Sequence, residues 1–156
     1  MAEIVVSVAS STEDLEDARA LFAEYAASIG FSLSFQGFDR ELAELPGRYA
    51  PPSGRLLLAR IEGVVAGCVA MRDLGDRGCE MKRLFVRPAF HGKGCGRRLA
   101  VAVIEEARRE RYRTMKLDTV PAMRAAIALY ASLGFREIAP YTENPVEGAR
   151  FLELQL

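Results

Sequence analysis

Histidine and cysteine are scarce in this sequence. Its 156 residues include one histidine, His91, and three cysteines, Cys68, Cys79 and Cys95. An odd number of cysteines without metal-ligand spacing argues against a disulfide framework and against a zinc site, which would have to use a single histidine. Catalysis by a Ser–His or Cys–His pair would have to use His91 as well. We therefore expect no metal, a small core residue at Cys68, and no covalent intermediate on a cysteine.

Long apolar runs and an excess of one charge are also missing. No apolar stretch approaches the roughly 18 residues that a membrane-spanning helix needs, and the first residues lack the basic-then-apolar pattern of a secretory signal. We therefore expect a soluble, cytoplasmic protein. Basic and acidic residues balance at 21 each, so no overall field attracts nucleic acid or an acidic membrane. The length and the 50% hydrophobic content predict one domain over residues 1–156.

Residues 81–99 are the most informative stretch. An apolar strand runs into Gly92, Gly94 and Gly96 at alternate positions, and these run into a helix. Glycine has no Cβ, so the backbone can approach a ligand closely. The N-terminus of the helix presents free N–H groups and the positive end of its dipole, which favours an anion and most often phosphate. Six basic residues cluster around this loop and predict a local anion site: Lys82, Arg83, Arg87, Lys93, Arg97 and Arg98.

Several kinds of glycine loop need separating. A P-loop requires Ser or Thr after Gly-Lys, whereas Gly92-Lys93 is followed by Gly94. A dinucleotide fingerprint requires a third glycine where Cys95 or Arg97 stands, although Asp118 follows at about the spacing of the ribose-binding acid. A nucleotide-binding protein with an unusual phosphate loop therefore stays open as an alternative, as does a glycine-rich turn without a ligand.

The remaining periodicity predicts a mixed α/β fold. Strand-forming runs occupy residues 3–9, 55–62, 64–72, 79–86, 113–120, 136–141 and 149–156. Helical periodicity occupies residues 10–30, 38–45, 96–112 and 121–134, with Pro121 expected to open the last helix. Residues 31–37 are expected to form an aromatic-lined loop. This order predicts a central mixed sheet of about six to seven strands, flanked by helices on both faces.

Two segments resemble the GNAT family of N-acetyltransferases. His91-Gly92-Lys93-Gly94-Cys95-Gly96 resembles the acyl-CoA signature [Arg/Gln]-x-x-Gly-x-[Gly/Ala], with His91 where the family usually has Arg or Gln. Tyr130-Ala131-Ser132-Leu133-Gly134-Phe135 resembles the Tyr-x-x-x-Gly-Phe ending of the family's fourth helix. The order of elements also agrees with the single-domain acyl-CoA N-acyltransferase fold. The resemblance covers nearly the whole chain, with specific motifs in residues 79–99 and 123–135.

The resemblance implies acetyl-CoA as the acetyl donor. Its contacts are expected at the end of the strand, in the loop and in the first helical turn, at Leu84, Phe85, Val86, His91, Gly92, Lys93, Gly94, Cys95, Gly96 and Arg97. The family often has Asn before the fourth helix, where it contacts the pantetheine arm. Met123 stands at the matching place, and a thioether cannot replace both the donor and the acceptor of an amide.

The resemblance also implies two catalytic groups. Tyr130 is expected to protonate the departing CoA thiolate; the alternative is a core aromatic on the helix stripe. The acceptor amine is mostly an ammonium at neutral pH, so a base is needed, and Glu80 on the strand that leads to the loop is the candidate. The alternative for Glu80 is a strand carboxylate paired with Lys82 or Arg72. Asp118 or Thr119, at the end of the next strand, is a further candidate for holding a water.

The acceptor pocket is expected in the variable segments, at Phe31, Phe35, Gln36, Tyr141 and Asn144. Two aromatics with an amide suit a small amine or an amino-acid-like acceptor, and the lack of an acidic groove argues against a large protein acceptor. We expect direct transfer in a ternary complex. A non-catalytic CoA-binding or sensing module of the same fold is the alternative, and the resemblance allows a homodimer.

Overall fold

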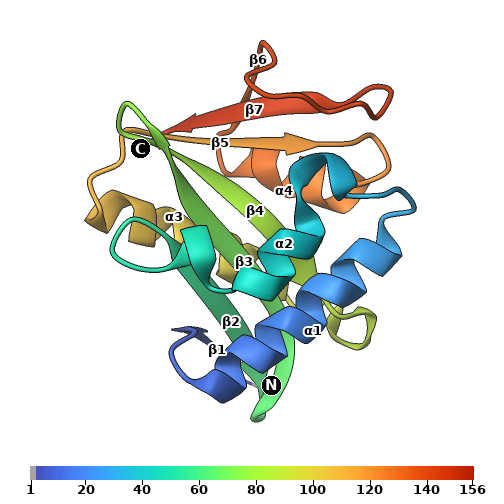
Figure 1. Ribbon diagram of the computed structural model, residues 1–156, viewed down its shortest axis with the longest axis vertical. Coiled ribbons are helices and arrows are strands. Elements are labelled where there is room, and N and C mark those ends of the chain that lie inside the picture. The colour runs from blue at the N-terminus through green and yellow to red at the C-terminus, as the bar shows by residue number, and fades with distance from the viewer. Residues whose placement is uncertain (1–2) are drawn as a thin grey trace.

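The computed structural model describes residues 3–156, with the side chain of Phe35 outside the described part. A seven-stranded sheet runs through the molecule in the order β1-β2-β3-β4-β5-β7-β6 (Figure 1). The strands are β1 (Ile4–Val8), β2 (Arg55–Ile61), β3 (Val64–Gly75), β4 (Gly78–Val86), β5 (Thr114–Thr119), β6 (Arg136–Ile138) and β7 (Arg150–Gln155). The helices are α1 (Thr12–Ser28), α2 (Phe38–Glu44), α3 (Cys95–Arg109) and α4 (Arg124–Ser132). Three 3₁₀ turns are η1 (Ser34–Gln36), η2 (Gly47–Tyr49) and η3 (Pro88–Phe90).

Helices cover both faces of this sheet, as the sequence predicted. In Figure 1, α1 and α2 lie in front of the strands, and α3 and α4 lie behind them. Each layer has its own apolar core. Phe22 of α1 and Phe38 of α2 belong to the front core, while Leu99 and Val103 of α3 belong to the rear core. Cys68 on β3 is fully buried in the front core, which confirms its expected role.

Local signals account for where the main helices start. At α1, Ser11 accepts a hydrogen bond from the backbone N–H of Asp14, and the Asp14 carboxylate accepts from the Ser11 N–H, which completes a capping box. The helix α3 is preceded by the N-cap residue Gly94, whose φ of 82° lies in the left-handed region that glycine tolerates. The apolar stripe of α3 then faces the sheet, as its sequence periodicity predicted.

Pairing between β4 and β5 is short and parallel. The two strands pair only from Gly78 with Thr114 to Glu80 with Lys116. Beyond Glu80 they diverge (Figure 1), and a cavity of about 50 Å³ lies between them. This divergence opens the middle of the sheet where the strand leads into the glycine loop.

A bulge in β4 changes which residues face the front layer. The register between β3 and β4 shifts where Cys68 and Ala70 pair with Phe85 and Lys82, and Arg83 has a φ of 60°. An extra residue in one strand breaks the usual alternation of side chains. As a result, Lys82 and Arg83 both contact the front layer.

Some predicted boundaries are wrong. Pro121 does not open α4, because residues 121–123 form a turn and the helix begins at Arg124. The strand predicted over residues 64–72 is longer in the structure, because β3 continues to Gly75. Asp76 and Arg77 close the hairpin with φ values of 52° and 62°, the left-handed conformation that tight hairpin turns require. Among the described residues, no helix is both long and apolar enough to cross a membrane.

Candidate active site

The glycine loop leaves room for a ligand. Gly92 and Gly94 have φ values of 77° and 82°, and a Cβ built at either position would have no neighbour within 4 Å. No side chain caps the start of α3, whose first backbone bond runs from the Arg98 N–H to the Gly94 carbonyl. The first-turn N–H groups therefore lack intrahelical partners. This arrangement suits an anion at the start of α3.

The ring of His91 ties the loop back to the strand before it. Its Nε2 lies 2.8 Å from the carbonyl oxygen of Val86, so this nitrogen donates its proton within the loop. Lys93 and Arg97 are exposed, and Arg97 donates to the Ser132 hydroxyl at the end of α4. These contacts place two cations beside the open helix end and connect the loop to α4.

The other basic residues expected around the loop have partners elsewhere. Arg83 makes two hydrogen bonds to the Glu41 carboxylate, and Arg87 makes two to Glu24. Arg98 donates to the Ile4 carbonyl. Lys82 donates to Gln36 of η1 in the front layer. The predicted six-residue cluster is therefore corrected to a smaller one around Lys93 and Arg97.

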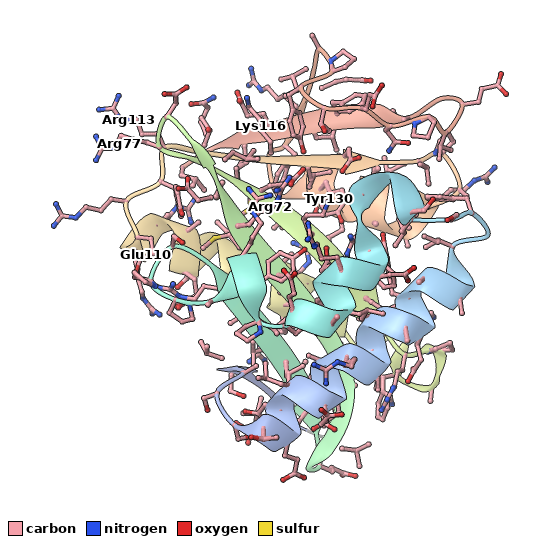
Figure 2. All side chains as sticks on the ribbon, in the orientation of Figure 1. Arg72, Arg77, Glu110, Arg113, Lys116 and Tyr130 are labelled. Carbon is pink, nitrogen blue, oxygen red and sulfur yellow. The ribbon has the colours of Figure 1, made fainter. Side chains whose placement is uncertain are left out.

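Tyr130 lies at the opening between β4 and β5 (Figure 2). Its side chain lines the 50 Å³ cavity and packs against Phe135, with ring centroids 5.6 Å apart. Burial raises the pKa of the Tyr130 phenol, and the negative charge of Asp118 adds to that effect. No described side chain or backbone group is a hydrogen-bond partner of its hydroxyl, which is not sealed from solvent. The phenol is thus protonated at neutral pH and available to a ligand in the opening.

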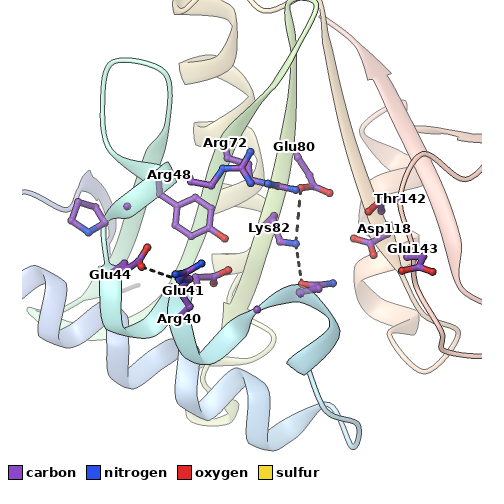
Figure 3. A pocket seen from close by; sticks show the side chains of 15 residues that line it. Arg40, Glu41, Glu44, Arg48, Arg72, Glu80, Lys82, Asp118, Thr142 and Glu143 are labelled. Carbon is purple, nitrogen blue, oxygen red and sulfur yellow. Dashed lines mark hydrogen bonds and ion pairs between the residues drawn. The ribbon is translucent and has the colours of Figure 1, made fainter.

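A second, larger cavity lies in front of the sheet. It has a volume of about 590 Å³ and is lined by parts of residues 36–49, by β3 and β4, by the end of β5, and by residues 142–143 (Figure 3). Figure 3 shows Arg72, Glu80 and Lys82 projecting into it from the sheet, and Asp118 and Glu143 on the opposite side. The lining is strongly charged, with cations and anions from separate segments of the chain.

Glu80 is held in the wall of this larger cavity. Its side chain is 1% exposed, yet both carboxylate oxygens have partners. Arg72 Nε donates to Oε1 at 2.7 Å, and the Tyr141 hydroxyl donates to Oε2 at 2.6 Å. Burial alone would raise the pKa of Glu80, but Lys82, Tyr141 and Arg72 outweigh it and lower the pKa below the ordinary value. Glu80 is therefore a carboxylate at neutral pH.

The two cavities meet at three side chains. Gln36, Lys82 and Asp118 line both of them. The Lys82 ammonium donates to Gln36 Oε1 at 2.9 Å, and Asn144 donates to Asp118 Oδ2 at 3.0 Å. A ligand in the larger cavity can therefore reach the opening beside Tyr130.

The acceptor residues expected from the sequence are distributed over both cavities. Phe31 and Asn144 line the smaller cavity, and Gln36 lines both. Tyr141 contacts Glu80, and the side chain of Phe35 lies outside the described part of the structure.

The expected cofactor residues at the end of β4 lie on different sides of the sheet. Leu84 lines the smaller cavity. Phe85 instead packs edge-on against Tyr25, with ring centroids 6.0 Å apart. Val86 contributes its carbonyl to His91, and Cys95 is buried at the start of α3.

Sequence reasoning missed most of the charged lining. Arg40 lies in a segment predicted only as a short helix, Arg48 and Tyr49 follow that helix, and no motif marks these residues. Arg72 was not missed, because the sequence analysis named it and Lys82 as alternative partners of Glu80. The structure contains both ion pairs, and the β3–β4 register places Arg72 directly across from Glu80. Met123 lines the smaller cavity, and its Sδ accepts a hydrogen bond from the Thr119 hydroxyl at 3.7 Å.

Comparisons with known proteins identify the family. The family model described as the Acetyltransferase (GNAT) family matches residues 15–135. An uncharacterized N-acetyltransferase of Schizosaccharomyces pombe is 39% identical over 155 residues, which cover 98% of this chain and 95% of that protein. An N-acetylaspartate synthetase of Danio rerio is 33% identical over 126 residues, covering 80% of this chain and 45% of that protein.

A solved structure shares the fold. The structure of YncA from Salmonella typhimurium, described as a putative acetyltransferase with its cofactor acetyl-CoA, superimposes with a TM-score of 0.74 at 24% identity. The match covers 97% of this chain and 93% of that one. At this level of identity the likeness concerns the fold, while the family match rests on the sequence. The chain, with its mixed sheet and helices on both faces, is therefore an acyltransferase that belongs to the acetyltransferase (GNAT) family.

Proposed function

We propose that this protein transfers the acetyl group of acetyl-CoA to the amine of a small, amino-acid-like acceptor, directly and within a ternary complex. One observation carries the proposal. The charged 590 Å³ cavity meets the opening between β4 and β5 at Gln36, Lys82 and Asp118, beside Tyr130. Two substrates that enter from opposite sides of the sheet can therefore meet at one point.

The glycine loop fits the pyrophosphate of CoA. The space where Cβ atoms of Gly92 and Gly94 would lie is open, and the first-turn N–H groups of α3 lack side-chain caps. Lys93 and Arg97 would add charge beside the phosphates. The diverging strands leave a slot for the pantetheine arm next to Leu84 and Met123. Met123 offers no amide there, so we assign the arm's polar contacts to strand backbone.

Glu80 and Tyr130 take the two proton-transfer roles. Glu80 is ionised and lies in the wall of the acceptor cavity, where it accepts the amine proton through a water molecule. Attack of the free amine on the thioester carbonyl forms the new C–N bond and breaks the C–S bond. Tyr130 donates its phenolic proton to the departing sulfur and regains a proton from solvent. Asp118, at the junction, is a second position that can hold the water.

The size and charge of the larger cavity and the name of one relative support an amino-acid-like acceptor. The cavity carries charges of both signs and suits a small polar molecule better than an apolar one. The Danio rerio relative is named for N-acetylaspartate, an amino acid acetylated on its nitrogen. For that protein the name describes the product; for this chain it supports the same class of acceptor.

Thiol release with an amine panel tests the proposal. The protein is first examined by thermal shift with acetyl-CoA, CoA, ATP and NAD, and a large shift is expected with acetyl-CoA. Free CoA is then measured as thiol with a panel of amines and amino acids. Acetyl-CoA binding with acceptor-dependent thiol release is the expected result. Stabilisation by ATP or NAD in place of acetyl-CoA would contradict the proposal.

A further inference from the structure

We propose that the acceptor is a zwitterion, whose carboxylate is bound by the Lys82 ammonium and whose amine faces Asp118. This inference rests on the proposed acetyl transfer and names the class of acceptor. Its starting point is a buried cation whose hydrogen-bond donors the protein does not fill. The side chain of Lys82 is only 9% exposed, and its Nζ forms a long ion pair of 4.0 Å with Glu80, although lysine is rarely buried without close partners.

Lys82 keeps donors that the protein leaves unused. An ammonium has three N–H donors. One reaches Gln36 Oε1 at 2.9 Å. Glu80 Oε1 lies 4.0 Å from Nζ, which is too far for a hydrogen bond, and no other described group accepts from Lys82. Two donors therefore remain for a ligand at the junction of the cavities.

The charge of Glu80 is shared between Lys82 and Arg72. Glu80 Oε1 accepts a hydrogen bond from Arg72, which is closer than Lys82, and Oε2 accepts one from the Tyr141 hydroxyl. Burial lowers the pKa of Lys82, while the charge of Glu80 opposes that shift. The wall formed by Arg72, Glu80 and Lys82 thus has one positive charge more than negative charges. A ligand carboxylate would restore the balance.

The opposite wall has the complementary sign. Asp118 and Glu143 line it (Figure 3). Among the described residues, the neutral amide of Asn144 alone donates a hydrogen bond to Asp118 Oδ2. Elsewhere in the lining, Arg40 and Glu44 form an ion pair with each other. An amine would be attracted to the Asp118 side while its carboxylate faces Lys82.

This orientation brings the amine to the reaction point. Lys82 and Asp118 line both cavities, so a small zwitterion between them lies next to the slot that Tyr130 faces. The carboxylate and the amine of the acceptor must lie close together, since Lys82 and Asp118 lie at the same junction. An alkylamine of the same size would leave the Lys82 donors without an acceptor, which is costly in a buried site.

The test compares amino acids with their carboxamides, which keep the shape but lose the negative charge. Rates of thiol release are expressed per concentration of free amine, because the amides have more basic-form amine at a given pH. The parent protein is expected to favour the acid of each accepted pair by about 10- to 100-fold in kcat/KM. Lys82→Met, which keeps an unbranched side chain, should abolish this preference mainly by raising KM for the acid.

An exposed cation provides the control. Arg136 on β6 is exposed and lines neither cavity, so Arg136→Met should leave the acid-to-amide ratio unchanged. Equal kcat/KM for acids and amides in the parent would overturn the zwitterion, even if Lys82→Met could not be purified. Acetylation of alkylamines alone would overturn it and leave acetyl transfer intact. Absence of both acetyl-CoA binding and thiol release would instead overturn the proposed function.

Discussion

The Tyr141 hydroxyl donates a 2.6 Å hydrogen bond to Oε2 of Glu80. The two residues are 61 positions apart in the sequence, and the bond joins the segment between β6 and β7 to β4. Because Tyr141 contacts the ionised carboxylate, it favours the charged form of Glu80. The proposed base is therefore tuned by a residue on a different element.

Tyr141→Phe should move the pH dependence of catalysis. Loss of the hydroxyl removes one of the groups that lower the pKa of Glu80, so this pKa should rise towards the ordinary value of 4.5. If ionised Glu80 is the base, the acid limb of the kcat/KM profile moves to higher pH. A profile measured with the best acceptor checks this. An acid limb that stays in place would separate Glu80 ionisation from the rate.

Glu80→Gln should reduce kcat/KM by roughly 100-fold or more near neutral pH, because the amide cannot accept the amine proton. The loss should shrink at high pH, where more of the acceptor is already the free amine. Steady-state rates across pH test this. Glu137→Gln, at an exposed carboxylate on β6, is the control and should leave the profile unchanged. An equal loss at every pH would indicate a positioning role for Glu80.

Tyr130→Phe should separate chemistry from packing. The ring remains against Phe135, so Tm should change little, and acetyl-CoA should still bind through the glycine loop. Turnover should fall by roughly 10²–10⁴-fold, the usual range for loss of a general acid. Stability, acetyl-CoA affinity and turnover are measured on the same preparation.

Tyr130→Ala provides the contrast for packing. Deleting the buried ring should lower the free energy of unfolding by about 3–5 kcal/mol. Near-parent turnover in a folded Tyr130→Phe protein would remove the phenol from the mechanism and leave only this structural role.

Gly96→Val should weaken acetyl-CoA without unfolding the protein. A Cβ at Gly96 would meet Val86 and Leu129 at ordinary contact distances of 3.8 and 3.9 Å. The added side chain should instead obstruct close approach of the pyrophosphate, at a cost of about 2 kcal/mol in binding free energy by analogy with lost charged hydrogen bonds. Calorimetry measures the affinity. Unchanged binding would exclude the start of α3 as the phosphate site.

Gly94→Val gives a useful comparison at the same loop. Gly94 has a φ of 82°, which a β-branched residue adopts only with strain. This variant should therefore lose stability as well as affinity, whereas Gly96→Val should lose affinity alone. Urea denaturation of both variants distinguishes backbone strain from ligand obstruction.

Glu41→Gln should destabilise the fold. The Arg83 side chain is 2% exposed and pairs with Glu41 at 2.8 Å, so the substitution leaves a buried guanidinium without its counter-charge. The free energy of unfolding should fall by about 3 kcal/mol. Glu44→Gln breaks the exposed pair with Arg40 and should change stability little, because solvent screens such pairs. Equal effects in urea denaturation would contradict this distinction.

The sequence alone determined the order of elements and the place of the cofactor loop. Those signals are local. Apolar periodicity distinguishes helices such as α3 from strands, and glycine favours the positive φ found at Gly92 and Gly94. For the same reason, the position of Tyr130 on the inner face of α4 was readable from the stripe of that helix.

Tertiary structure decided the charges of the acceptor cavity. Alternation along a strand places Lys82 and Arg83 on opposite faces, but the bulge turns both towards the front layer, where Arg83 pairs with Glu41 and Lys82 lines the cavity. The cavity itself joins residues 36–49 to Asp118 and Glu143. The bulge and the approach of distant segments depend on how the whole sheet packs, so no local pattern of residues specifies them.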